Sequence, residues 1–244
     1  MDSLISSIEN LQINYELKPI IKLQALFRGA LYRKKNIPNV FRVINNILKE
    51  NKILFTDGND GRTNSIIDEK YVLDILKTKL KNRIKISKDR HWHDFYVIDN
   101  GIKYPVNLKI TNCKSADNVG NFALCVYAYT DHQMDLEQSY NNGAMSKILI
   151  EKLKNKRLNY CLSRDYFFVV INKSNNDIII NSMKSLDHLT YNINNLPFQI
   201  RWDKNTNYNP KRINKVVKSF VELFSREIIY WKKYFIDNIT NCYE

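Results

Sequence analysis

The sequence predicts an α/β domain in which helices flank a mixed central β-sheet. Segments with the two-residue period of strands alternate along the chain with segments of helical period. The dipeptide Asn100-Gly101, between two strand-like runs, is a strong signal for a β-hairpin. The 244 residues, of which 44% are hydrophobic, suffice for one core. We therefore expect one domain over residues 55–244, preceded by a helical extension over residues 1–54.

The first expected element is a basic amphipathic helix over about residues 19–35. Its sequence resembles the IQ motif, the pattern of helices that calmodulin-type EF-hand proteins bind, at Leu23-Gln24, Arg28-Gly29 and Arg33. Three interpretations stay open: core packing with a basic outer face, contact with a nucleic-acid backbone, and binding of a calmodulin-like protein. Core packing is favoured, because short motifs of this kind also arise by chance.

The second expected helix begins after the N-cap residue Ser65 and ends near Leu80. At 100° per residue, one apolar stripe contains Ile66, Val72, Leu73, Leu76 and Leu80. Glu69 falls near the centre of this stripe and Asp68 towards its edge. A carboxylate in a core stripe is costly unless it is paired or binds a metal, so Glu69 is a candidate site residue and Asp68 ranks second. The competing interpretation is that Glu69 only interacts favourably with the helix dipole.

The hairpin follows. Aromatic and β-branched residues fill Phe95–Ile98, and apolar residues alternate with polar ones over residues 102–111. If Asn100-Gly101 is a two-residue loop, Asp99 pairs with Ile102. Counting back along both strands then places Asp94 opposite Asn107, and the period of two places Lys109 on the same face as Asn107. The hairpin therefore predicts that an acid, an amide and a lysine converge.

His91 and His93 offer a rival metal site just before the hairpin. In an extended strand their rings share the face opposite Trp92, and His93 points away from Asp94. We therefore expect these histidines to pack or to form hydrogen bonds and not to share a metal with Asp94.

The remaining elements continue the alternation of strands and helices. Expected strands are residues 122–129, 165–171 and 177–183. A basic helix is expected over residues 145–158. The last helix is expected from Asn209-Pro210, as N-cap and first-turn proline, to about Asp237. Its wide apolar face indicates a core helix or, as the alternative, a dimer helix.

A helix with Glu69, then Asp94, then Asn107-Leu108-Lys109 resembles the PD-(D/E)xK nuclease superfamily, and in particular its type II restriction endonucleases. Two positions depart from the family pattern: His93 replaces the usual proline, and Asn107 replaces an acid. Further segments similar to restriction enzymes are residues 57–65, 90–95, 105–110, 114–118 and 196–202. The resemblance covers about residues 55–205 and implies a restriction-endonuclease-like fold.

The resemblance also implies Mg²⁺-dependent hydrolysis of phosphodiester bonds in double-stranded DNA. Asp94 would be the main metal ligand, with the Leu108 carbonyl and Asn107 beside it. Lys109 would orient or deprotonate the attacking water and stabilise the transition state. Glu69 would contact the site directly or through water. The implied catalytic residues are Glu69, Asp94, Asn107 and Lys109.

Polar segments around the motif would contact DNA. The candidates are Arg62, Lys114, Asn118, Arg201 and Lys204. Cutting both strands usually needs two active sites, so a homodimer is expected. Two alternatives remain: a DNA-binding protein of the same fold that is weakened or inactive because of Asn107, and an interaction protein that binds a calmodulin-like partner.

Charge and cysteine usage are consistent with an intracellular nucleic-acid partner. The net charge of +13 points to a polyanion. No signal peptide and no run of about 20 apolar residues is recognised. The four cysteines, Cys113, Cys125, Cys161 and Cys242, have neither zinc-site nor disulfide spacing. We expect a reducing cytoplasmic location, in a viral host cell or a virion if the source is a virus.

Overall fold

A computed structural model describes residues 37–51, 53, 55–56, 61–119, 121–190 and 197–225. The chain divides into two compact units, Met1–Ile37 and Pro38–Glu244. The description below concerns the second unit. The predicted IQ-like helix lies outside the described residues.

The second unit is built on a mixed five-stranded sheet, as the sequence predicts. Its strands are β1 (Ile84–Ile86), β2 (Phe95–Asp99), β3 (Ile102–Thr111), β5 (Phe167–Asn172) and β6 (Ile178–Ser182). Their order is β1-β2-β3-β5-β6. The central pair β3 and β5 is parallel, and the other neighbours are antiparallel.

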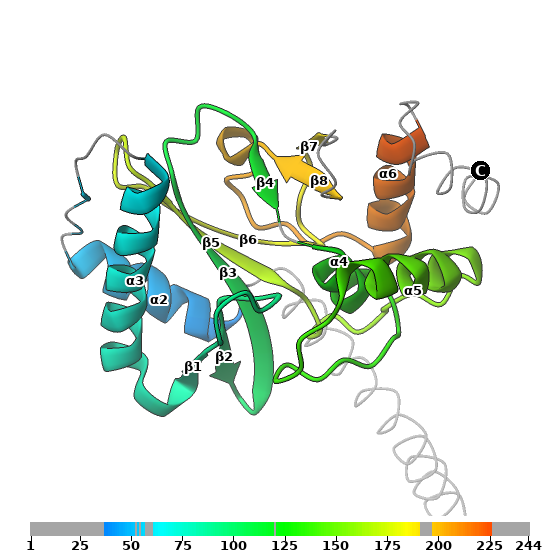
Figure 1. Cartoon of the computed structure of the whole chain (residues 1–244), viewed down its shortest axis with the longest axis horizontal. Coiled ribbons are helices and arrows are strands. Elements are labelled where there is room, and N and C mark those ends of the chain that lie inside the picture. Colours follow the sequence, from blue (N-terminus) through cyan, green and yellow to red (C-terminus); the bar gives the residue numbers. More distant parts are fainter. Residues whose placement is uncertain are drawn as a thin grey trace, which may run out of the picture. The chain divides into compact units, whose positions relative to one another are not determined.

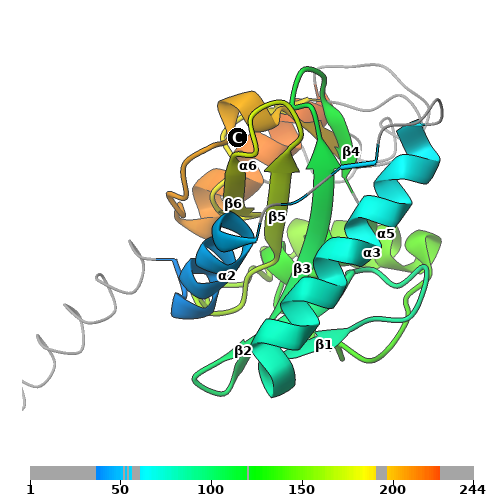
Figure 2. The same ribbon diagram turned by 90° about the vertical axis from the view of Figure 1, so that its left-hand side faces the viewer.

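Helices cover both faces of this sheet (Figure 1). Two of them, α2 (Asn39–Glu50) and α3 (Gly61–Leu80), lie in front of the sheet in Figure 2. On the other side lie α4 (Phe122–Tyr129), α5 (Asn142–Lys154) and α6 (Ile213–Ser225). A second sheet on that side has the order β4-β8-β7 and consists of β4 (Asp117–Val119), β7 (Leu189–Thr190) and β8 (Phe198–Ile200). Single 3₁₀ turns form η1 (Lys81–Arg83) and η2 (Trp202–Lys204).

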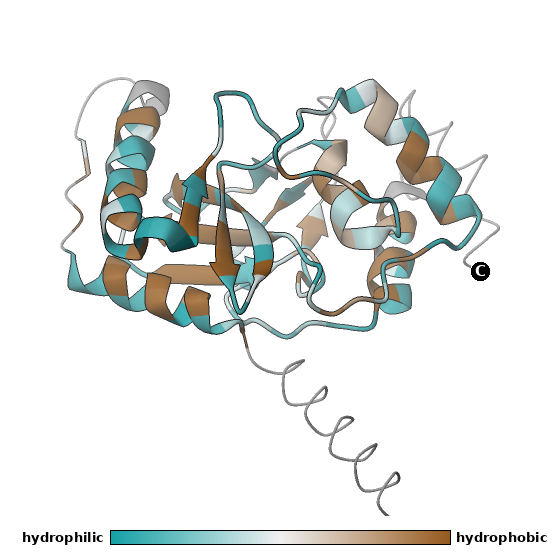
Figure 3. Cartoon of the chain, turned by 90° about the horizontal axis from the view of Figure 1, so that it is seen from below, coloured by the Kyte–Doolittle hydropathy of each residue, from teal (hydrophilic) through white to brown (hydrophobic). Residues whose placement is uncertain are grey.

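Helix α2 packs into the core, although it lies within the predicted extension of residues 1–54. The Phe41 ring stacks on Phe167 of β5, with ring centroids 4.1 Å apart. Figure 3 shows both hydrophilic and hydrophobic bands on the helices, as expected for helices that cover a sheet. None of the described helices is long and apolar enough to span a membrane.

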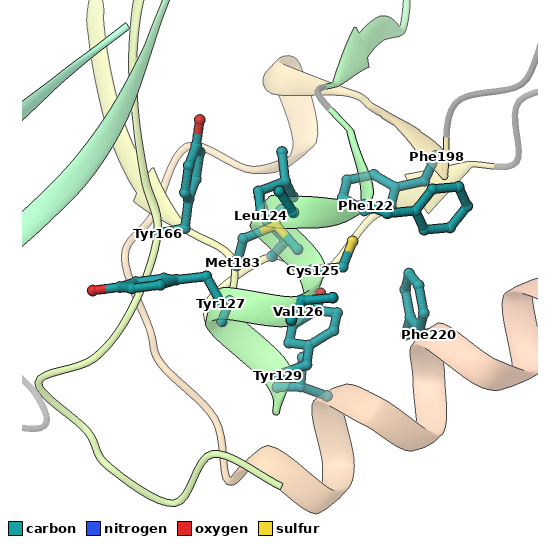
Figure 4. Close-up of a cluster of buried hydrophobic side chains, with 14 of the residues drawn as sticks. Phe122, Leu124, Cys125, Val126, Tyr127, Tyr129, Tyr166, Met183, Phe198 and Phe220 are labelled. Carbon is teal, nitrogen blue, oxygen red and sulfur yellow. The ribbon is translucent and has the colours of Figure 1, made fainter. Parts of the chain in front are cut away.

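The prediction of a strand over residues 122–129 is wrong, because this segment is helix α4. All eight residues are buried, so the sequence has no polar side from which a period could be read. The Asn121 side chain caps the helix by accepting a hydrogen bond from the Ala123 amide at 3.0 Å. Figure 4 shows α4 enclosed by side chains that include Tyr166, Met183, Phe198 and Phe220. Tertiary packing thus overrides the β propensity of its valine and aromatic residues.

The predicted starts of two helices are also wrong. Helix α3 begins at Gly61 and not after Ser65. Ile66 lies off the stripe of α3 and is 61% exposed, because six residues at 100° each turn it 120° away from Val72. Helix α6 begins at Ile213, because the preceding backbone bonds elsewhere: Asn209 N–H donates to Ser185 Oγ at 2.6 Å, and Lys211 N–H donates to the Lys184 carbonyl at 2.9 Å.

Candidate functional site

An open strand edge defines the site. The β2–β3 register runs from Phe95 opposite Val106 to Asp99 opposite Ile102, which confirms the predicted hairpin pairing. Asp94 N–H donates at 2.9 Å to the carbonyl of Val106, the residue already opposite Phe95, so the regular register ends at Phe95 and the chain bulges at Asp94. The predicted backbone pairing of Asp94 with Asn107 is therefore not formed, although their side chains are hydrogen-bonded. Strand β3 then runs on to Thr111 with β5 as its only strand partner in the described part of the chain. The edge of β3 facing β2 is therefore free of a strand beyond Val106.

The Asp94 carboxylate occupies the start of this open edge. Its Oδ2 accepts hydrogen bonds from Asn107 Nδ2 at 2.9 Å and from the Leu108 amide at 2.7 Å. Burial raises the pKa of Asp94, whereas the Leu108 N–H and the Lys109 ammonium oppose this shift. Both hydrogen bonds end on the same carboxylate oxygen. The carboxylate is thus held in one orientation while Oδ1 stays available for another partner.

Two further oxygens lie beside Asp94. The Asn107 Oδ1 atom is buried and has no hydrogen-bond partner among the described residues. A buried carbonyl oxygen without a partner is costly, so this atom is a candidate to accept a water or a cation. The Leu108 carbonyl lies on the Asp94 side of β3, because the C=O and N–H of a strand residue point to the same edge. Carboxylate, amide and backbone oxygens are the donors that a hard cation such as Mg²⁺ accepts.

A metal centre made only of acidic, histidine or cysteine side chains is not found in the described ranges. No group of three or more such side chains there could hold a metal ion. A cation at Asp94 would therefore depend on the Asn107 amide oxygen and the Leu108 carbonyl as ligands. Magnesium also keeps several waters, so this donor set fits the ion.

Glu69 on α3 belongs to the same group of charges. Burial raises its pKa to about 7, with Lys109 lowering it and Asp94 raising it further. These effects require the Glu69 carboxyl to lie within electrostatic range of both Asp94 and Lys109. The structure therefore brings together the helix residue and the hairpin residues that the sequence singled out.

Asp68, the second-ranked acid, has a structural role. It is 2% exposed and accepts hydrogen bonds from the Thr56 amide and hydroxyl at 2.8 Å each. Lys173 Nζ forms an ion pair with it at 2.6 Å. Burial by itself would raise the pKa of Asp68, but the Lys173 and Thr56 hydrogen bonds outweigh it and lower the pKa. Through its ion pair with Lys173, Asp68 connects α3 to the turn after β5.

Asp117 is a site residue that the sequence did not single out. Burial raises its pKa, whereas the Thr111 hydroxyl, which donates to its Oδ1 at 3.4 Å, and Lys109 lower it. Asn107, Lys109 and Thr111 share one face of β3, so Lys109 lies between the Asp94 end and the Asp117 end of this row. One signal was present: Asp117 is the only acid between Lys109 and Asp131.

The predicted DNA-contact residues have different surroundings. Lys114 and Lys204 are exposed. Asn118 on β4 is exposed and accepts a hydrogen bond from Gln199 Nε2 at 2.8 Å. Arg201 forms two bonds to Asp203, at 2.9 and 2.7 Å, which neutralise its charge. Arg62 lies in the first turn of α3, but its side chain is outside the described part.

The histidines form hydrogen bonds at the entry to β2, as expected. His93 Nδ1 is 2.7 Å from Ser87 Oγ, and His93 Nε2 is 3.0 Å from the Leu136 carbonyl. His91 Nε2 lies 2.9 Å from the same carbonyl. These contacts connect the β2 entry to the loop between α4 and α5.

His93 should make stability depend on pH. Burial lowers its pKa from 6.5 to about 4, so the native state favours the neutral ring. This contribution is complete above pH 6.5 and is lost as the pH falls towards 4, by at most about 3 kcal/mol. Urea unfolding from pH 7.5 to 4 should show that His93→Gln lacks this loss, whereas the exposed control His188→Gln retains it. Parallel pH dependence in wild type and His93→Gln would contradict the assignment.

No protein-family model and no curated protein sequence matches the chain.

Proposed function

We propose that this protein is a Mg²⁺-dependent endonuclease that cuts double-stranded DNA at specific sequences, in the manner of type II restriction endonucleases. The convergence of Asp94, Lys109 and Glu69 at the open edge of β3 carries the proposal. The unpartnered Asn107 oxygen beside Asp94 supports a cation site there. The net charge of +13 fits a polyanionic substrate.

Each residue has a role in phosphodiester hydrolysis. A bound Mg²⁺ supplies neutralisation of phosphate charge and a lowered pKa for water. Asp94, the Asn107 amide oxygen and the Leu108 carbonyl would hold the ion. Lys109 orients the attacking water and stabilises negative charge on the phosphorus oxygens in the transition state. Ionised Glu69 accepts a hydrogen bond from water in the site and, through its pKa near 7, is poised to take up a proton.

A second candidate is a DNA-binding protein of the same fold that does not cut. The observation in its favour is Asn107, which stands where the nuclease family has an acid and which donates a hydrogen bond to Asp94. The site then has one carboxylate fewer to attract a divalent ion. Such a protein would still bind DNA in a strongly salt-dependent way.

Incubation of long plasmid DNA with the protein and Mg²⁺, followed by sequencing of the ends, separates these candidates. The proposed function predicts discrete fragments whose ends share one sequence. Smeared products would contradict sequence specificity. Salt-sensitive binding without cleavage in Mg²⁺, Mn²⁺ or Co²⁺ would favour the second candidate.

Glu69 should set the pH dependence of cleavage. With a pKa of about 7, its ionised form falls tenfold for each pH unit below that value. The cleavage rate should therefore rise up to about pH 7 and then level off. Raising the Mg²⁺ concentration should move this rise to lower pH, because a cation favours the ionised form. Glu69→Gln should remove the rise and slow cleavage about 10- to 100-fold. The exposed control Asp74→Asn on the same helix should keep the pH-dependent rise and the wild-type cleavage rate. An unchanged pH profile in Glu69→Gln would contradict the role of Glu69.

We extend the proposal to assembly and location. Cutting both strands usually needs two active sites, which a homodimer would supply. Light scattering of the protein with and without DNA tests this state. Cys113 and Cys125 are buried free thiols, in keeping with a reducing cytoplasmic location.

A further inference from the structure

The small sheet β4-β8-β7 has one apolar face and one polar face. Phe198 and Ile200 of β8 are fully buried, and the Phe198 ring packs edge-on against Phe220 of α6 at 6.1 Å. Figure 4 shows these two rings on the core side. Since neighbouring residues of a strand face opposite ways, Gln199 points to the other side. In the sheet register Gln199 pairs with Asn118 on one neighbour and with Thr190 on the other, so a polar row crosses the sheet.

The Gln199 amide has a fixed orientation within this row. Its Nε2 donates to Asn118 Oδ1 at 2.8 Å, which distinguishes the nitrogen end of the amide from the oxygen end. The amide carries two N–H groups, so one N–H and the Oε1 acceptor remain for a ligand, and they lie side by side when the Asn118 bond uses the N–H turned away from Oε1. Gln199 is half-buried and therefore loses little side-chain freedom when it binds a ligand.

An adjacent donor and acceptor of this kind fit one base in particular. In the major groove, adenine offers the N7 acceptor beside the N6 amino donor, and glutamine or asparagine pairs with both. Guanine offers two acceptors at these positions, so it would face the Oε1 acceptor with another acceptor. Strands are also known elements for contacting base edges in a groove.

Strand β4 connects the row to the nuclease site. Strand β4 carries Asp117 within electrostatic range of Lys109 and, one residue later, carries Asn118 on the opposite face. Figures 1 and 2 both show β4 beside the end of β3. A duplex bound along the edge of β4 would offer a phosphate to one face of the strand and a base edge to the other. The exposed Lys114, just before β4, adds positive charge that complements the backbone.

We propose that Gln199, oriented by Asn118, binds the major-groove edge of an adenine and so determines the sequence that this protein recognises. Oε1 accepts a hydrogen bond from the adenine N6 amino group, and Nε2 donates to N7. Asn118 is a positioning residue that acts through Gln199. This inference rests on the proposed function, because it assigns the specificity of that same DNA site.

The test is selection of bound sequences from a random duplex pool, with Ca²⁺ in place of Mg²⁺ so that the readout is binding and not cleavage. Wild-type protein should enrich a sequence with adenine at one position by at least about 10-fold over the other bases. Gln199→Ala should lose this preference at that position alone. Gln199→Glu, an acceptor only, should shift the preference to cytosine, whose N4 amino group is a donor.

Matched variants test whether Asn118 orients the Gln199 amide or is needed only for folding. Asn118→Ala should weaken the adenine preference, whereas Asn118→Asp, which can still accept from Gln199, should restore it. Gln133→Ala, an exposed glutamine far from this sheet in the sequence, should leave it unchanged. Far-UV circular dichroism confirms that each variant is folded.

The outcomes distinguish this inference from the proposed function. Enrichment of no sequence by wild type, or the same adenine preference in folded Gln199→Ala, overturns the inference whatever the plasmid assay shows. Selection as expected without any cleavage in Mg²⁺ overturns the endonuclease activity and leaves Gln199 as the specificity residue of a DNA-binding protein.

Discussion

If the protein cleaves DNA as proposed, replacing Lys109 with alanine should lower the cleavage rate about 1,000-fold. In the described part of the chain, Lys109 is the one cation that lowers the pKa of all three acids of the site, Glu69, Asp94 and Asp117. Its ammonium would be lost from the point where negative charge develops on the phosphate, and preorganised charges of this kind contribute about 100- to 1,000-fold each. Single-turnover cleavage at saturating protein measures this loss without a contribution from product release.

The matched control is Lys103→Ala on the same strand. Lys103 is exposed at the other end of β3, where its ammonium lies 5.2 Å from the centre of the Tyr96 ring. This variant should cut at a rate within about twofold of wild type, since exposed charges far from a reaction contribute little. DNA binding by Lys109→Ala, measured in Ca²⁺, should fall far less than its cleavage rate. Near-normal cleavage by Lys109→Ala would place the chemistry elsewhere.

Replacing Lys184 with methionine should destabilise the fold by about 3–5 kcal/mol, the range found when the partner of a buried charged group is removed. Lys184 is 2% exposed, and its Nζ donates to three carbonyls: Asn159 at 3.1 Å, Cys161 at 2.8 Å and Arg164 at 2.9 Å. Burial raises the pKa of the neighbouring Asp165 to about 6, and the positive charge of Lys184 opposes this rise. The variant leaves three carbonyls and a buried carboxyl without their cation. The free energy of unfolding in urea, followed by far-UV circular dichroism, measures the loss.

Two further variants sharpen this second prediction. Lys147→Met removes an exposed lysine on α5 and should change the free energy of unfolding by less than about 0.5 kcal/mol. Asp165→Asn in the Lys184→Met background should recover part of the loss, because the buried carboxyl that lost its partner is then neutral. Equal stability of Lys184→Met and wild type would show that the loop of residues 159–164 does not depend on this lysine.

The hairpin was predictable because local rules determine it. Asn100 and Gly101 both have positive φ, 50° and 78°, as a two-residue turn requires. That turn sets the register from Asp99 back to Phe95, which brings Asp94 beside Asn107 without any tertiary information. The bulge at Asp94 was not predicted. The mixed sheet followed from the alternation of strand-like and helical segments, since parallel strands such as β3 and β5 need a long crossover.

Other features depend on tertiary contacts that no local pattern contains. Helix α4 is apolar on all sides because it is surrounded, so its sequence has neither the period of a helix nor that of a strand. Asp117 reaches Lys109 only because β4 returns beside the end of β3. Asp68 is fully buried because Lys173, 105 residues later, neutralises it. Charge pairs between distant segments are therefore the part of the site that composition and periodicity do not predict.

Strand β2 begins only at Phe95, and the uncovered edge of β3 that results has a consequence for self-association. Beyond Val106 the free edge of β3 offers backbone groups with which a strand of another chain could pair, and such edges nucleate aggregates. Asp94 occupies the first of these positions, because its carboxylate holds the Leu108 N–H. An inward-pointing charge at a strand edge discourages intermolecular pairing. Asp94→Ala therefore frees the Leu108 amide for pairing with another chain and also removes the carboxylate. Asp94→Asn removes the charge but keeps an oxygen that accepts from the Leu108 amide. Inactivity caused by aggregation is thus distinguishable from inactivity caused by loss of the carboxylate charge.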